Sequence, residues 1–484
     1  MLAIGIDLGT SGIKAVLLED AVRVLAAAHR PVSVSIPEVG QSEQDADGWV
    51  SAVFACLDEL AAARPDHMAA VAGIGLSGQM LSALLLDGNL RPLRPAMLWN
   101  DQRAMAECAD LLAAVPDIGQ RTNGTPDPGI TAPKLLWLAR HEPRVFGAAR
   151  MLLLTKDYVR LALTGEVASD PTDAGGTQLF DVARGVWAED LCAAVGWDMA
   201  HLPCVVPSWQ AAGGLRAGLA ARWGLRPGLP VAAGAGDNMG STLGAGAARP
   251  GDAVLSIGTS GVANLVDRAF HPGPGVAVLT SAHAAPDAFL SMGVVMSATA
   301  ALDFSARLTG TDAVTLAGEA GAMDARAIAA APVFLPCLNG VRTPANRPGA
   351  TGRIEGLHPG TNRAALGFAT MEGVAFQFAD CVRAQRSIGV TPERFIAVGG
   401  GTRSALWVRL LATALDVSIT LPAGADGAGP SGAARLAMVA AGAPIETLAT
   451  PLEVAATIDP DPDLARLLVA RKARFDGLMA SLGE

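Results

Sequence analysis

Residues 1–19 read MLAIGIDLGTSGIKAVLLE, and this stretch decides the fold because its GTSG turn occurs again in the second half of the chain. The first copy spans residues 9–12 and the second spans residues 258–261, within VLSIGTSGVANLV. Each copy lies between short apolar runs, which is typical of a glycine turn that closes a β-hairpin. A hairpin built twice, about half a chain apart, indicates an internal duplication.

The elements that surround the two turns follow the same order. In the first half, the patterns predict three antiparallel strands at residues 4–7, 13–18 and 22–28, a helix that begins after Asp45 or Asp47, and a buried strand in residues 68–78. In the second half, they predict a hairpin at residues 252–266, a strand at 288–297, a long helix at 363–389, and a strand at 394–398 that ends in glycines, with two more helices packed beyond it.

The length of the chain also favours two domains, since 484 residues exceed one ordinary core. We expect an α/β protein whose N-terminal domain is residues 1–243 and whose C-terminal domain is residues 244–484. The glycine-rich segment 240–249 is the predicted boundary between them.

Composition excludes several classes of function. A formal net charge of −10 argues against nucleic acid or an anionic membrane surface as the main partner. The six cysteines form no CxxC pair, which argues against a zinc site and is typical of a reducing compartment. The first residues carry no basic segment with a cleavage site, so we expect a cytoplasmic protein with no membrane contact.

The lysines exclude one nucleotide-binding scaffold. The chain has only four, at Lys14, Lys134, Lys156 and Lys472, and none of them follows a glycine. The Walker A loop needs Gly-Lys to bring an ammonium group to the phosphates of a nucleotide. The segment GIGLSG at residues 73–78 matches the dinucleotide fingerprint GxGxxG, but the residues after it predict a strand and a turn rather than the helix that the fingerprint requires.

Three other glycine-rich segments carry candidate chemistry. The GTSG turns have small side chains and free backbone amides, so two of them facing one cleft could hold the phosphates of a nucleotide; each is otherwise an ordinary tight turn. Asp7, which precedes the first turn, suits hydrated Mg²⁺, and its alternative is a turn aspartate bonded to amides. The three glycines 399–401, between a strand and a helix, leave room for the flat ring of an adenosine.

Asp237 and Asn238 lie in the segment AAGAGDNMGSTLG, among glycines and without a bulky neighbour. We expect an exposed, flexible segment whose carboxylate approaches a hydroxyl group of the substrate and serves as a general base in phosphoryl transfer. The alternative is a loop aspartate without a catalytic role.

Taken together and in order, these segments resemble the FGGY carbohydrate kinases, and most of all the bacterial D-xylulose kinases. The resemblance covers about residues 1–440 and rests on these stretches: IGIDLGTSGIK, SGQM, LWNDQR, APKLLWLARHEP, LTKDYVRLALTGEVASDPTDAGGT, GAGDNMGS, SIGTSG and VGGGTRS. The second signature of the family is also present, as GRIEGLHPGTNRAALGFATME, with Ala365 where a polar residue is usual.

The resemblance implies two ribonuclease H-like domains of the actin, Hsp70 and hexokinase superfamily, with ATP and Mg²⁺ in the cleft between a sugar-binding and a nucleotide-binding domain. It implies that Asp237 is the catalytic base and that Asp7 handles Mg-ATP. The implied ATP-binding residues are Gly9, Thr10, Ser11, Gly258, Thr259, Ser260, Gly400, Gly401 and Ser404. The implied substrate-binding residues are Gln79, Met80, Leu81, Trp99, Asn100, Asp101, Asp237 and Asn238.

The expected reaction is phosphorylation of D-xylulose to D-xylulose 5-phosphate, and a homodimer is left open as the assembly. One departure bears on the acceptor: xylulose kinases usually read GQMHG where this chain reads GQMLS, so Leu81 replaces a histidine that contacts the sugar. Leucine cannot hydrogen-bond a hydroxyl group, which leaves ribulose, L-xylulose, a pentitol or a tetritol as alternative acceptors. A nucleotide-switched ATPase of the actin or Hsp70 type is the alternative from a different class.

Overall fold

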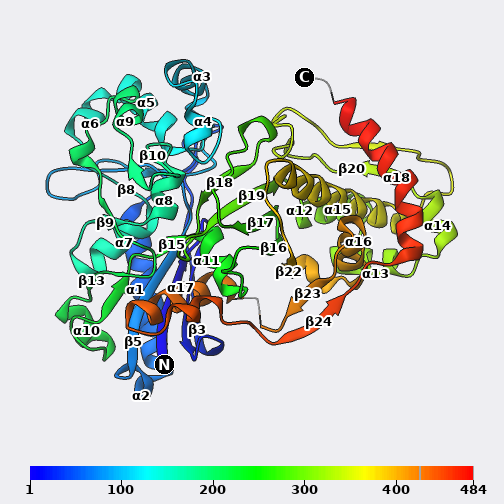
Figure 1. Ribbon diagram of the computed structural model, residues 1–484. Coiled ribbons are helices and arrows are strands. Elements are labelled where there is room, and N and C mark those ends of the chain that lie inside the picture. The colour runs from blue at the N-terminus through cyan, green and yellow to red at the C-terminus, as the bar shows by residue number, and fades with distance from the viewer. Residues whose placement is uncertain (425–426, 483–484) are drawn as a thin grey trace.

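The first GTSG turn joins β1 (Leu2–Leu8) to β2 (Gly12–Glu19) as an antiparallel hairpin, which confirms the prediction. The computed structural model describes residues 1–424 and 427–482 and has two lobes, each built on a seven-stranded mixed sheet (Figure 1). The first sheet has the order β13-β14-β5-β1-β2-β3, with β15 also paired to β5. Its other strands are β3 (Arg23–Pro31), β5 (Val71–Gly78), β13 (Ala211–Gly214), β14 (Pro230–Ala232) and β15 (Ala235–Gly236).

The second sheet repeats the plan of the first. Its hairpin joins β16 (Asp252–Ile257) to β17 (Gly261–Asp267), and β16 pairs in parallel with β22 (Arg394–Val398), as β1 pairs in parallel with β5. The order is β18-β19-β17-β16-β22-β23-β24. The remaining strands of this sheet are β18 (Leu279–Ala282), β19 (Phe289–Val295), β23 (Ile419–Pro422) and β24 (Val454–Ile458). The shared pairing supports the predicted duplication.

Helices and short strand pairs complete each lobe. In the first half of the chain they are β4 (Glu43–Gln44), α1 (Ala46–Ala63), α2 (Pro65–Met68), β6 (Leu84–Leu86), β7 (Ala96–Met97), α3 (Met105–Ala114), α4 (Ile118–Arg121), α5 (Thr131–His141), α6 (Pro143–Ala148), β8 (Met151–Leu153), α7 (Thr155–Thr164), β9 (Ala168–Ser169), α8 (Pro171–Gly176), β10 (Phe180–Asp181), β11 (Val186–Trp187), α9 (Glu189–Ala194), β12 (Cys204–Val205), α10 (Ala217–Trp223) and α11 (Asp237–Gly244). In the second half they are α12 (Thr299–Leu308), α13 (Ala313–Gly321), α14 (Ala325–Ala330), β20 (Val333–Leu335), β21 (Arg353–Glu355), α15 (Arg363–Ser387), the 3₁₀ turn Gly400–Arg403, α16 (Ala405–Leu415), α17 (Ala428–Ala440) and α18 (Pro462–Ala480).

Each lobe has its own apolar core, and both cores include the hairpin that opens the sheet. In the first lobe, Ile4, Ile6 and Leu8 pack with Trp49 of α1. In the second, residues of β16 and β17 pack with the long helix α15. Among the helices of the described residues, none has the length and apolar character needed to cross a membrane.

Helix α17 leaves the lobe of its sequence neighbours and packs on the first sheet, against β1 and β5 (Figure 1). The sequence predicted that this helix would pack beyond the glycine turn at 399–401, but it packs on the sheet of the first lobe instead. Its backbone sits directly on the strands, since a Cβ on Gly5 would lie 1.8 Å from Pro430 O and one on Gly75 would lie 1.9 Å from Ala433 O.

Contacts of this kind account for two of the three glycines in the GxGxxG match at residues 73–78, and β5 is followed by β6 rather than by a helix, as the sequence predicted. A Cβ on Gly73 would lie 2.7 Å from Ala437 O, one turn further along α17. Helix α11 packs on the same helix in the same way, because a Cβ on Gly244 would lie 1.8 Å from Ala428 O. Glycines therefore bring α11, α17 and the first sheet close enough for the candidate site to form between them.

Candidate active site

Asp7 lies near the carboxyl end of β1, where its Oδ1 accepts a hydrogen bond from Ser77 Oγ at 2.8 Å. The two residues are partners in the parallel register of β1 and β5. On its other side the carboxylate meets the start of α17, since a Cβ on Gly429 would lie 2.7 Å from Asp7 Oδ2. Burial raises the pKa of Asp7 above the ordinary aspartate range.

Asp237 is the first residue of α11, so the expectation of an exposed, flexible segment is wrong for this position. The helix forms although its sequence, DNMGSTLG, has little helical propensity, because its glycines permit close packing on α17. Burial, and next the charge of Asp7, raise the pKa of Asp237 to about 7. Its Oδ1 accepts hydrogen bonds from the amide of Asn238 at 2.7 Å and from that side chain at 3.2 Å.

The first GTSG turn is tied to the predicted sugar-contacting residues. Thr10 Oγ1 donates to Gln79 Oε1 at 2.9 Å and accepts from Trp99 Nε1 at 2.9 Å. Gln44 completes the network, because its Nε2 donates to Thr10 O and its Oε1 accepts from Gln79 Nε2, both at 2.7 Å. The Thr10 hydroxyl group is thus already hydrogen-bonded to the side chains of Gln79 and Trp99. Within the described residues, the backbone amides of Thr10 and Ser11 donate no hydrogen bond to another backbone group, so they are available to bind an anion.

Met80 and Leu81 follow β5 directly. Met80 is buried, and its side chain fills the space beside Gly236, where an added Cβ would lie 2.4 Å from Met80 Sδ. Leu81 has a φ of +67°, a left-handed conformation that an ordinary side chain rarely adopts. Its carbonyl oxygen accepts hydrogen bonds from Lys134 Nζ at 2.9 Å and from Thr131 Oγ1 at 3.1 Å, and these bonds hold the turn.

Of the three residues in the WND motif, the structure exposes Trp99 and Asn100 and buries Asp101. Both oxygens of Asp101 are bonded, to Arg103 at 2.9 and 2.8 Å and to the amide of Ser42 at 2.7 Å. The structure therefore does not bring Asp101 into an open pocket with Trp99. Its geometry suits a residue that shapes this loop.

The second GTSG turn is one residue tighter than the first, because Ile257 pairs with Gly261 whereas Leu8 pairs with Ile13. Gly258 N donates to Ser260 O at 3.0 Å, two residues on, whereas Gly9 N donates to Gly12 O at 3.1 Å, three residues on. The carbonyl oxygens of Gly258 and Thr259 accept from the first amides of α12, at 2.8 Å from Thr299 N and 2.9 Å from Ala298 N. Ser260 and Ser11 are both exposed at the tips of their turns.

A cavity of about 720 Å³ adjoins the glycines after β22. Gly400, Gly401 and Ser404 line it, together with the small residues Ala313, Ala317, Gly318 and Gly321 of α13. Gly401 is required by packing, since a Cβ would lie 2.3 Å from Ile257 Cγ2, whereas a Cβ on Gly400 would meet nothing within 4 Å. Ser404 caps α16 through a bond from Trp407 N at 3.3 Å. A flat apolar group fits against this wall of small residues.

Sequence reasoning missed two groups of residues near the site. One is a set of supporting residues: Ser77 bonds Asp7, Gln44 bonds the first GTSG turn, and Lys134 bonds the carbonyl oxygen of Leu81. The other is a buried ionic cluster around Lys156. The sequence held one signal, because Lys134 and Lys156 are two of only four lysines. The structure buries both of them fully. Burial lowers the pKa of Lys134 to about 7.

The structure has two lobes with duplicated hairpins, and it places the carboxylates of Asp7 and Asp237 where α17, from the second half of the chain, meets the first sheet. These features define an ATPase fold of the actin and hexokinase class. Residues 2–244 match the N-terminal domain of the FGGY family of carbohydrate kinases, and residues 253–441 match its C-terminal domain. The chain belongs to this family. It is therefore a carbohydrate kinase, and such kinases use ATP.

Similar proteins are known in sequence and in structure. A xylulose kinase of Escherichia coli K12 is 40% identical over 438 residues, which cover 90% of this chain and 90% of that protein. A solved structure described as a xyloylose kinase from Brucella ovis has a TM-score of 0.96 and 42% identity, covering 100% of this chain and 99% of that one. A xylulose kinase from Rhodospirillum rubrum has a TM-score of 0.91 and 31% identity, covering 100% and 99%.

Proposed function

We propose that this protein transfers the γ-phosphoryl group of ATP to D-xylulose and releases D-xylulose 5-phosphate. The relatives that share 40% and 42% of their residues with this chain, over nine-tenths or more of its length, support this acceptor. In this proposal the sugar binds in the domain formed by residues 1–243 and the nucleotide binds in the domain formed by residues 244–484.

One observation carries the mechanism: Asp237 begins a helix beside Asp7 and has a pKa of about 7. A carboxylate with that pKa is half ionised near neutral pH, so it can accept the proton of a sugar hydroxyl group. In a ketopentose the reacting hydroxyl is that on C5. Met80, Gln79 and Trp99 position the sugar, and Asn238 holds the carboxylate by the two bonds to its Oδ1.

Asp7 fits a role with Mg²⁺. The described residues contain no cluster of three histidine, cysteine, aspartate or glutamate side chains that could hold a metal ion by themselves. Mg²⁺ needs no such cluster, because it keeps several waters and takes one or two carboxylates together with phosphate oxygens. When bound, the ion would neutralise charge on the transferred phosphoryl group. Asp7 would hold it, and the raised pKa of Asp7 would fall as the ion binds.

The nucleotide would use both turns and the cavity. In our proposal the amides of residues 9–11 and 258–260 bind phosphate oxygens, and the adenosine lies along Gly400, Gly401 and Ser404. The cavity of about 720 Å³ and the missing side chain at Gly400 support this placement.

Leu81 supports a second candidate acceptor within the same reaction. Its side chain packs with Met80 in an apolar cluster, next to Gly176, where an added Cβ would lie 2.9 Å from Leu81 Cδ2. An apolar side chain there cannot pair a sugar hydroxyl, so another ketopentose, a pentitol or a tetritol would fit if its hydroxyl groups avoid this wall.

An ADP-release assay over a panel of ketoses and polyols tests the acceptor. We expect the highest kcat/KM with D-xylulose for the parent protein, and a further gain for Leu81→His through an added hydrogen bond. If the parent instead prefers another acceptor and only Leu81→His uses D-xylulose well, the second candidate is correct. If no sugar or polyol stimulates ADP release, the proposed activity is wrong.

A further inference from the structure

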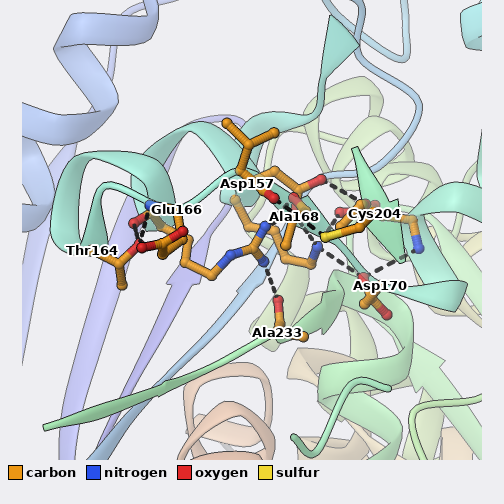
Figure 2. Close-up of polar contacts among 12 residues, drawn as sticks. Asp157, Thr164, Glu166, Ala168, Asp170, Cys204 and Ala233 are labelled. Carbon is orange, nitrogen blue, oxygen red and sulfur yellow. Dashed lines mark hydrogen bonds and ion pairs between the residues drawn. The ribbon is translucent and has the colours of Figure 1, made fainter. Parts of the chain in front are cut away.

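A buried ionic cluster lies behind the segment that ends at Asp237. Lys156 Nζ lies 2.7 Å from Asp157 Oδ1, 2.8 Å from Asp170 Oδ1 and 2.9 Å from Asp173 Oδ2, and all four side chains are fully buried. Figure 2 shows Asp157, Asp170 and Ala233 gathered in this cluster. Removing so many charges from water is costly unless they are paired, and none of these residues contacts solvent.

Two bonds connect the cluster to the backbone before Asp237. Arg160, which lies 3.1 Å from Asp157, donates through Nη1 to Ala233 O at 2.6 Å. Thr172 Oγ1 accepts the amide hydrogen of Gly236 at 2.8 Å and donates to Asp170 Oδ2 at 2.7 Å. Gly236 is the residue immediately before helix α11, so its amide sets the direction in which α11 leaves β15.

Thr172 is held by its own surroundings. Asp170 caps α8, accepting from Thr172 N at 2.9 Å, and it also accepts from Ser208 Oγ at 2.7 Å. The carbonyl oxygen of Thr172 accepts from Ser281 Oγ of β18, in the second lobe, at 3.3 Å. The hydroxyl that meets Gly236 therefore has one available orientation.

We infer that Thr172 is a positioning residue for the catalytic base: its hydroxyl group, fixed by Asp170 and the lysine behind it, holds the start of α11 so that Asp237 points at the acceptor hydroxyl. The inference rests on the proposed role of Asp237. A buried ionic cluster fits this task because its paired charges resist displacement, and a shift of about 1 Å at a reacting group can cost roughly a hundredfold in rate.

Thr172→Val keeps the shape of the side chain and removes its hydroxyl. We expect kcat to fall roughly ten- to a hundredfold, with the KM for the sugar nearly kept, and we expect Thr172→Ser to retain most of the activity. Thr413→Val is the matched control, because Thr413 is also buried and its Oγ1 accepts the amide hydrogen of Asp461, before α18, at 3.1 Å. That variant should lose thermal stability and keep its kcat.

The double variant Asp237→Asn with Thr172→Val separates positioning from folding. If Thr172 acts through Asp237, the second substitution adds no further loss of kcat. A normal kcat for Thr172→Val, or a full additional loss in the double variant, overturns the inference while Asp237 stays the base. A normal kcat for Asp237→Asn alone overturns the proposed base, and the inference with it.

Should Thr172→Val fold poorly, Ser208→Ala offers a second test, because it removes one hydrogen-bond donor to Asp170. We expect a smaller loss of kcat for this variant, and this loss should likewise vanish in the Asp237→Asn background.

Discussion

Arg342 Nη2 lies 2.7 Å from Asp127 Oδ2, and this ion pair joins the two halves of the chain. Asp127 also accepts the amide hydrogen of Gly129 at 3.0 Å, and an added Cβ on Gly129 would lie 2.0 Å from Trp99 O. The ion pair therefore connects a loop of the second lobe to the loop that packs on the backbone of Trp99. With the sugar bound beside Trp99, as we propose, this contact would keep the lobes closed over it.

We predict that breaking this ion pair weakens sugar binding. Asp127→Asn or Arg342→Gln should each raise the KM for the sugar by roughly fivefold, the effect of about 1 kcal/mol for a partly exposed pair. The exchanged pair Asp127→Arg with Arg342→Asp should recover part of the loss. Steady-state kinetics at saturating ATP measure it, and an exchanged pair no better than the single variants would contradict the prediction.

The close approach of α17 to the first sheet predicts a sharp loss of stability at Gly75. A Cβ at this residue would lie 1.9 Å from Ala433 O, so Gly75→Ala must displace the helix. We expect overpacking to cost about 1–3 kcal/mol or more, seen as a lower Tm. Gly147→Ala is the control, since it lies in α6 with nothing within 4 Å of the added Cβ, and it should keep or raise the Tm. An unchanged Tm for Gly75→Ala would contradict the packing described above.

The raised pKa of Asp237 predicts how the stability of the ligand-free protein depends on pH. The unfolded carboxyl group ionises near its ordinary value of 3.8 and the folded one near 7, so stability falls as pH rises between these values and is then constant. The Asp237→Asn variant has no carboxyl group at this position, so its stability should not show this fall. The Tm of the variant minus that of the parent should therefore grow between about pH 4 and pH 7, as measured by calorimetry. A difference that does not vary with pH would mean that Asp237 has an ordinary pKa.

The same pKa predicts an acid limb in the pH dependence of kcat/KM. The base must be ionised to accept a proton, so the free enzyme should gain activity as pH rises through about 7. Because the charge of Asp7 contributes to the shift, Asp7→Asn should move the limb of any residual activity to lower pH. A limb that stays in place would show that the two carboxylates do not interact.

The sequence predicted both hairpins and most of the elements around them, because a glycine turn between apolar runs is a local signal. It could not predict where α17 lies, since the contacts of Gly5 with Pro430 and of Gly75 with Ala433 join residues 425 and 358 positions apart and depend on the absence of side chains at both glycines. The helix at Asp237 was missed for the same reason: packing on α17, rather than propensity, stabilises it.

The candidate site was predictable in part. Motifs named Asp7, Asp237 and the two turns, and their roles stay predictions until they are measured. Asp101 was grouped with the substrate-binding residues because the resemblance includes it in one motif with Trp99 and Asn100, yet Arg103, two positions further on, pairs with both of its oxygens. The cluster around Lys156 lies within the quoted stretch LTKDYVRLALTGEVASDPTDAGGT, but that stretch alone does not show that its charged side chains are buried and paired, which only the folded protein shows.

The central claim is that Asp237 takes the proton of the acceptor hydroxyl, and one measurement tests it most directly. The rate of ADP release with D-xylulose and Mg-ATP should fall on the order of 10²- to 10⁴-fold in Asp237→Asn, the usual contribution of a positioned base. Calorimetric titration should show that the variant still binds the sugar. Turnover close to that of the parent protein would remove Asp237 from this role and contradict the account.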